Sequence, residues 1–141
     1  MEFNYTCEEN SGAFSFDVEM ESTRMTVRLG SSEEEMCVMA FAEAPFGIPK
    51  EKYYTVLSKI NKIHMEEFSI AHLFINEDSS HLMAQSIVSM GSVALDDETF
   101  RDLLLSPCYL IDSHFNEIMQ VIVSENLIDL KMAKEPNREL N

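Results

Sequence analysis

The N-terminal part of the chain alternates apolar and polar residues. From residue 14 to residue 21 every second position is Phe, Val or Met, and the positions between are Ser, Asp or Glu. This period of two predicts a half-buried β-strand. A second alternation spans residues 25–29, and a third apolar run, residues 35–43, follows Gly30 and a turn-like stretch. The three runs predict an antiparallel meander, and residues 3–7 are a candidate for a short edge strand.

The third run differs from the first because both of its faces are apolar, so something must cover each face. The Pro-containing stretch of residues 44–49 then ends the strand pattern. From Pro49 to His64 apolar residues recur at spacings of three and four, which predicts an amphipathic helix. Its other side carries Lys52, Lys59 and Lys62, and we interpret this basic side as a solvated helix face.

Two more strand-like runs, residues 67–75 and 81–90, flank a turn of Asn, Glu, Asp and Ser residues. They predict a hairpin whose strands also have two apolar faces. Asp96 then offers an N-cap for a long final helix, with Asp97 and Glu98 favourable in its first turn. Within that helix we expect Ser106-Pro107 to produce a kink or to divide it into two helices.

These elements predict an α+β fold, in which two main helices pack on an antiparallel sheet of about five strands in the order βββ-α-ββ-α. The length of 141 residues suits one domain, which we place at residues 1–130, with a flexible tail at residues 131–141.

A sheet with helices on one side only would leave its second face bare. Residues of the runs 35–43, 67–75 and 81–90 place apolar side chains there, and exposed apolar patches commonly mark an interface. Alternatively, a final helix divided at Pro107 would cover both faces. Methionines adapt their shape to different partners, and two of them are in the predicted partner or dimer interface. That interface consists of Cys37, Met39, Phe41, Leu73, Ile75, Met83 and Ile87.

Charge narrows the choice of partners. The chain has 25 acidic and 10 basic residues, a formal charge of −15. Because phosphate binding depends on Lys and Arg, we expect no nucleic-acid partner, and electrostatics favours a basic one. We expect no membrane association, because no apolar run approaches the roughly 20 residues that cross a bilayer. No signal peptide is visible, and the three cysteines form no disulfide framework, which together predict a cytoplasmic protein with reduced thiols.

The residues offer little chemistry. No nucleophile motif, P-loop or dinucleotide fingerprint is present, so we predict no catalytic residues, no cofactor and no enzyme. One alternative remains open. His72 and His81 could approach diagonally across the hairpin, and with a third ligand such as Glu77 they could hold a metal. The region of His72, His81 and Cys37 would then define a metal or ligand sensor, or an enzyme.

Several strings, together with the order of elements, resemble the YbjN-like family of putative bacterial sensory transduction regulators, whose members share the fold of type III secretion chaperones. The resemblance covers roughly residues 13–123. It is carried by the strand at 36–41, the Ile-Pro-Lys-Glu-Lys helix start at 48–52, the helix end at 57–64, the strand at 68–75 and the string Asp-Ser-His-Phe-Asn-Glu-Ile at 112–118. In that family a helix usually precedes the first strand, whereas here only residues 1–12 do.

The resemblance implies a small, acidic and often homodimeric protein that binds a segment of a partner, and it brings no catalytic residues. We therefore expect a non-enzymatic, homodimeric binding module, either a signalling regulator or a chaperone for a secreted protein or a toxin. A self-contained structural homo-oligomer is the other alternative. The sequence leaves open which face of the sheet the final helix covers.

Overall fold

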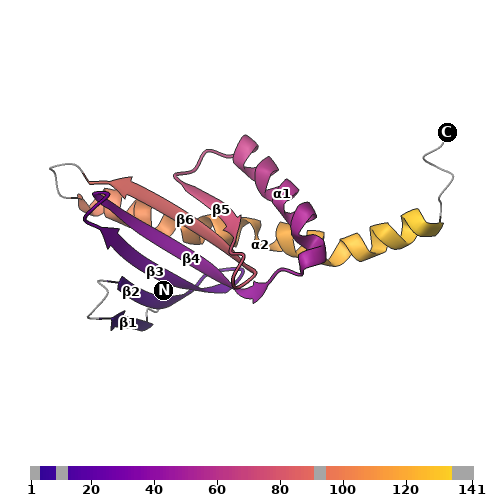
Figure 1. The fold of residues 1–141 in the computed structure, drawn as a ribbon, viewed down its shortest axis with the longest axis horizontal. Coiled ribbons are helices and arrows are strands. Elements are labelled where there is room, and N and C mark those ends of the chain that lie inside the picture. Colours follow the sequence, from indigo (N-terminus) through magenta and orange to yellow (C-terminus); the bar gives the residue numbers. More distant parts are fainter. Residues whose placement is uncertain (1–3, 9–12, 91–94, 135–141) are drawn as a thin grey trace.

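In a computed structural model the protein is described for the backbone of residues 4–8, 13–90 and 95–134, with side chains described within residues 14–90 and 95–123. Six antiparallel strands form one sheet in the order β1-β2-β3-β4-β6-β5 (Figure 1). The strands are β1 (Asn4–Glu8), β2 (Ala13–Glu19), β3 (Arg24–Ser32), β4 (Cys37–Gly47), β5 (Ala71–Ile75) and β6 (His81–Ser89). A 3-10 turn, η1 (Lys50–Lys52), leads into α1 (Tyr53–Glu66), and α2 (Asp97–Lys134) closes the fold.

The predicted α+β class and element order are confirmed, and the candidate edge strand is present as β1. Several boundaries were wrong. β4 does not end at residue 43 but continues through Pro45 to Gly47, with a register shift against β6. The missing N–H of Pro45 is tolerated there, because the pairing of β4 with β3 ends at Glu43 and one side of the strand is free of ladder bonds. β5 begins only at Ala71, so residues 67–70 lie outside the strand.

Both helices pack on the same face of the sheet. α2 crosses β6, β4 and β5, while α1 packs against β5 and α2. Figure 1 shows the central strands in front of α2, which extends past the end of the sheet. No helix within the described residues is long and apolar enough to span a membrane. The buried core between the layers includes Val27, Ala42, Val56, Leu82 and Ile111.

The pattern of small residues explains how closely the helix approaches the sheet. The positions of β4 that face α2 are Ala40, Ala42 and Ala44, and Ala84 of β6 lies beside them. All four are fully buried. Short side chains let the helix lie close to the strands, while larger residues such as Leu103 and Ile118 of α2 fill the space between the layers.

Pro107 does not divide the final helix, contrary to one of our two expectations, because α2 is continuous from Asp97 to Lys134. A proline in a helix has no N–H for the carbonyl four residues earlier, here that of Leu103. The hydroxyl of Ser86, on β6, donates a hydrogen bond to this carbonyl. Ser86 and Pro107 are both almost fully buried, so a buried carbonyl that the helix leaves unpaired is satisfied by the sheet.

α2 also holds the start of the meander. The carboxylate of Asp112 accepts hydrogen bonds from the backbone N–H groups of Ser22 and Thr23, at 2.8 and 3.3 Å, in the turn between β2 and β3. Phe115, one turn further along α2, makes an edge contact with Phe46 of β4, with ring centroids 5.5 Å apart. Both contacts lie within one turn of α2, so this turn fixes the end of the sheet where β3 begins and β4 ends.

The interpretation of the basic side of α1 as a solvated face is partly wrong. Lys52 is 5% exposed, and the ammonium group of Lys59 lies 3.1 Å from a carboxylate oxygen of Glu117 on α2. Only Lys62 remains an exposed lysine of the three. The C-terminal boundary also differs from the prediction, because α2 continues through Lys134, so the first residues of the predicted tail are helical.

The bond between Ser86 and Leu103 can be tested with a double-mutant cycle. Ser86→Ala should lower the free energy of unfolding by about 1–3 kcal/mol, because it leaves the buried carbonyl of Leu103 without a donor. In a Pro107→Ala background the new amide at position 107 can donate to that carbonyl, so the same serine substitution should cost clearly less. Urea unfolding of the four proteins measures both costs.

Ser89→Ala, at an exposed position of the same strand, is the control and should change stability by less than about 0.5 kcal/mol. Equal costs of Ser86→Ala in both backgrounds would contradict the assignment.

Candidate functional site

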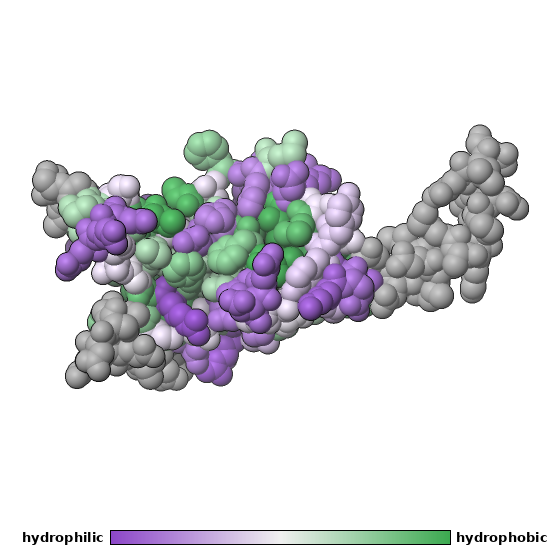
Figure 2. Space-filling model, in the orientation of Figure 1, coloured by the Kyte–Doolittle hydropathy of each residue, from purple (hydrophilic) through white to green (hydrophobic). Residues whose placement is uncertain are grey.

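The face of the sheet opposite the helices, which we call the open face, is the first candidate site. Strand register places alternate residues of each strand on it. Figure 2 looks onto this side of the molecule and shows apolar surface over the central strands, interrupted by polar and charged side chains. The apolar residues of the open face are Cys37, Met39 and Phe41 of β4, Phe74 of β5, and Met83 and Ile87 of β6.

These residues differ in how much of them solvent reaches. Ile87 is 50% exposed, and Met39, Phe41 and Phe74 are half-buried. Cys37 and Met83 are buried by their neighbours although no helix lies over them. The side-chain amide of Asn76 lies 3.4 Å from the sulfur of Met83 and closes one edge of the patch. The accessible part of the open face is therefore a band around Ile87, Met39 and the two phenylalanines.

Five of the seven residues predicted for the interface are brought together on this face, and two are not. Leu73 and Ile75 pair with Ala84 and Leu82, whose side chains face the helices. Leu73 is buried in the core, and Ile75 is partly buried and packs against that core. The predicted face of β5 was therefore wrong by one position, and a shift of one residue along a strand moves each side chain to the opposite face of the sheet. Phe74, between them in sequence, belongs to the open face instead.

Charged residues of both signs border the apolar band. Arg24 forms an ion pair with Asp17 at 2.8 Å, and Arg28 lies 3.8 Å from Glu43. The hydroxyl of Thr26 donates to the Asp17 carboxylate, and this bond, followed by that from Arg24, holds the pKa of Asp17 below its usual value. Nδ1 of His81 lies 2.9 Å from the other carboxylate oxygen of Glu43. With Glu19, which lies opposite Arg24, the border has three carboxylates and two arginines, so it is far less acidic than the chain as a whole.

The alternative site around His72, His81 and Cys37 is not assembled. All three residues lie on the open face, but at different heights along β6. His72 is opposite Gln85 of β6. His81 lies four residues before Gln85 on β6, and Cys37 is opposite Ser89, four residues after it. At the rise of an extended strand, each separation is about 13 Å. The expected diagonal approach of the two histidines was therefore wrong. Within the described residues no group of three His, Cys, Asp or Glu side chains could hold a metal ion.

The described thiols are also poorly placed for chemistry. Burial raises the pKa of the Cys108 thiol to about 12, and that residue is 1% exposed. Cys37 is buried as well, and both are free thiols. Because the thiolate is the reactive form, Cys108 in the folded protein is a packing residue rather than a nucleophile.

A second cluster lies where α1, α2 and the edge strand β5 meet, and no sequence pattern predicts it. Nε2 of His64 accepts a hydrogen bond from the backbone N–H of Leu73 at 2.9 Å. The Ser69 hydroxyl likewise accepts from the N–H of Ala71 at 3.1 Å. These bonds satisfy two backbone N–H groups on the outer edge of β5. Unpaired N–H groups at the edge of a sheet can otherwise pair with a strand of another molecule. Nearby, His114 of α2 contacts the carboxylate of Glu67.

The state of His64 follows from this geometry. A ring nitrogen that accepts a hydrogen bond must be unprotonated. Burial, and then the charge of His72, lower the pKa of His64 below its ordinary value of 6.5. The two imidazole rings have centroids 6.5 Å apart. The neutral form of His64 is therefore the one that closes the edge of β5.

Comparison with family models, with curated proteins and with solved structures finds no match for this chain. The site must be judged by its own geometry. The described residues of the open face form no nucleophile with a base and an orienting group. They form an apolar band beside a border that carries charges of both signs. Such a surface can bind another apolar surface.

Stability should depend on the protonation of His64. Since the pKa of this group is lower in the folded state than in the unfolded state, the unfolded chain binds more protons, and the free energy of unfolding should fall as the pH drops below about 6.5 toward the folded-state pKa. His64→Gln keeps a possible acceptor but cannot titrate, so its stability should fall less between pH of about 7 and about 5. Urea unfolding across this range measures the difference. Parallel curves for the two proteins would show that His64 does not carry this dependence.

Proposed function

We propose that this chain is a non-enzymatic protein-binding module that works as a homodimer, with the open face as the contact between two copies. The observation that carries the proposal is that both helices pack on one face of the sheet, while the other face has an apolar band that includes the half-exposed Ile87. Contiguous apolar surface of this kind commonly marks an interface in a protein that does not span a membrane.

The charges favour a second copy as the occupant of this face. The chain carries −15 overall, so two copies repel each other least where they meet through surface that carries charges of both signs. The border of the open face carries both signs, with Arg24 and Arg28 beside Asp17 and Glu43. In a two-fold contact in which this border meets its own copy, these arginines would lie near the carboxylates of the partner copy. Two sheet faces pack about 10 Å apart when their side chains interdigitate, and Met39 is suited to such a fit.

The resemblance to the YbjN-like family, and through it to type III secretion chaperones, supports the same class. Acidic charge and homodimerisation are properties of those proteins that the resemblance implies here. We therefore propose a cytoplasmic protein that holds a segment of a partner, as a signalling regulator or as a chaperone for a secreted protein or a toxin. The first described element of this chain is the edge strand β1, whereas that fold usually begins with a helix.

Two alternatives to the binding module differ from it in what they bind. A self-contained structural homo-oligomer would use the same face but bind no further protein. A metal or ligand sensor, or an enzyme, would need His72, His81 and Cys37 close together, and the strand register separates them. No observation favours that second function over the binding module.

The mass of the protein in solution tests the proposal. We expect light scattering to give a dimer, twice the 16.1 kDa of one chain, and Ile87→Glu to give a monomer or an insoluble protein, because it places a charge in the centre of the contact. Tyr54→Glu is the matched control: it adds the same charge in place of another exposed large residue, 84% exposed on α1, and should remain a dimer. A monomeric wild type, or an Ile87→Glu variant with unchanged mass and stability, would contradict the proposal.

A further inference from the structure

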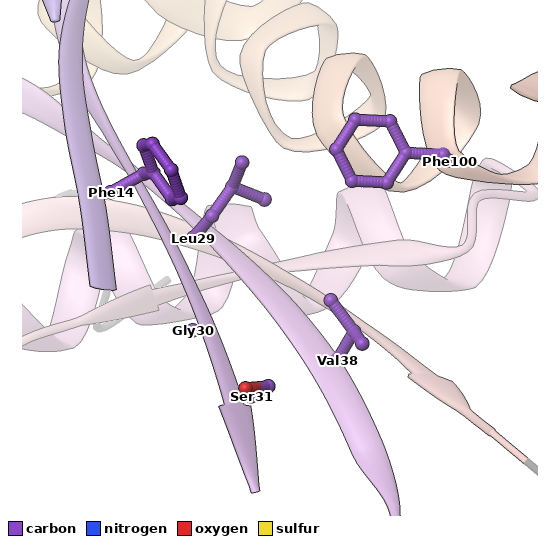
Figure 3. A pocket seen from close by; sticks show the side chains of 6 residues that line it. All are labelled: Phe14, Leu29, Gly30, Ser31, Val38 and Phe100. Atoms are coloured by element: carbon purple, nitrogen blue, oxygen red, sulfur yellow. The ribbon is translucent and has the colours of Figure 1, made fainter. Parts of the chain in front are cut away.

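A second apolar surface lies on the other side of the sheet, at the start of α2. It is a hollow of about 330 Å³ lined by Phe14 of β2, Leu29, Gly30 and Ser31 of β3, Val38 of β4 and Phe100 of α2. Figure 3 shows the two phenylalanine rings on opposite sides, with Leu29 between them and Val38 below Phe100 in this view. Its volume is at the small end of the range of about 300–1,000 Å³ that is typical of ligand pockets.

The hollow exists because the helix layer is narrower than the sheet. α2 packs mainly on β6, β4 and β5 and only slightly on β3. At this end of the molecule the helix side of β2 and β3 is therefore left open. Phe14 is 47% exposed and Phe100 is 39% exposed, so two aromatic rings form walls that nothing in the described chain covers.

Carboxylates neighbour two of the lining residues in the chain, after Ser31 and before Phe100. Ser31, in its wall, is followed by the exposed residues Glu33, Glu34 and Glu35 in the turn between β3 and β4. Phe100 is preceded by the acidic residues 96–98 at the start of α2, all of them exposed. Asp96 caps the helix by accepting the N–H of Thr99 at 2.7 Å. Among the described residues, none of these six carboxylates forms an ion pair, and the nearest bases in sequence are Arg28 for the first three and Arg101 for the others.

We propose that the hollow binds a segment of a partner protein in which an apolar side chain is flanked by lysine or arginine. The inference rests on the proposed function of a protein-binding module and supplies the chemistry of its partner. The apolar side chain would fill the space between Phe14 and Phe100, and the basic residues would lie against the neighbouring carboxylates. A second copy of this chain is a poor occupant, because its own charge of −15 would meet an acidic border.

The test uses short fluorescent peptides and the full chain. The first peptide has a central Phe flanked by Lys residues, the second replaces Phe by Ser, and the third replaces each Lys by Glu. Fluorescence anisotropy at about 0.05 M and about 0.5 M salt gives the dissociation constants. We expect the first peptide to bind tightest and to weaken at high salt. We expect the second to bind about tenfold more weakly or worse, since burial of an aromatic side chain is worth more than the 1.4 kcal/mol of one decade, and we expect the third not to bind.

Variants of the hollow locate the binding. Phe14→Ala with Phe100→Ala should weaken the first peptide about tenfold or more, since both residues are partly exposed and their walls are lost. Tyr54→Ala, at an exposed aromatic residue on α1, should not change it. Replacing Glu33, Glu34 and Glu35 by Lys should weaken binding and reduce its dependence on salt. The same change of charge at Glu66, Glu77 and Asp78, which are exposed on other parts of the surface, is the control for net charge.

Three results would overturn the inference: no binding of the first peptide, equal binding of the acidic peptide, or binding that the two phenylalanine substitutions leave unchanged. Loss of the dimer in the phenylalanine variant would instead make the hollow a contact between copies, which also overturns it. Light scattering of the same samples distinguishes failure of the peptide-binding inference from failure of the proposed dimer. A dimer that binds none of the peptides refutes the hollow and favours the self-contained oligomer, whereas a monomeric wild type refutes the dimer whatever the peptides do.

Discussion

The hydrogen bond from Ser86 to the carbonyl of Leu103 is the constraint on which the arrangement of this protein depends. Pro107 removes the normal helical partner of that carbonyl, in the most deeply buried part of α2. Without a donor from the sheet, the cost of an unpaired buried carbonyl would favour a break in the helix. The serine on β6 supplies the donor and so keeps the helix continuous over the strands it crosses. The same bond fixes α2 to the central part of the sheet.

Because α2 is continuous, the open face of the sheet has no helix over it. A helix broken at Pro107 could have sent its second half around the sheet, whereas a continuous one stays on one side with α1. Met39, Phe41 and Ile87 therefore lack any helix above them. At the Phe14 end of β2 the helix layer does not cover the sheet, and this leaves the hollow. One packing arrangement thus accounts for both apolar surfaces, and the charges around them differ. The border of the open face carries charges of both signs, which suits a second copy, while that of the hollow is acidic, which suits a basic partner.

Much of the fold could be predicted from the sequence, because its signals are local. The period of two in residues 14–21, the helical spacing after Pro49 and the capping residue Asp96 each act within a few positions. The faces of strands were harder. Leu73 and Ile75 were grouped with the wrong side because their place depends on pairing with Ala84 and Leu82, and hydrophobicity alone does not fix register when both faces of a strand are apolar. The partner of Ser86 is 17 positions away on another element, and nothing local marks it. The exposure of Phe14 and Phe100 depends on how far α2 reaches across the sheet, which is a property of the packed layers.

The central claim is that two copies meet through the open face, and the most direct measurement is of contacts between them. A mixture of isotope-labelled and unlabelled chains gives nuclear Overhauser effects that arise only between different copies. The account predicts such effects at the methyl groups of Ile87 and Met39, on the open face, and none at Leu57, an exposed residue of α1. Effects confined to Leu57 or other residues of the helix layer, with none at Ile87, would contradict it.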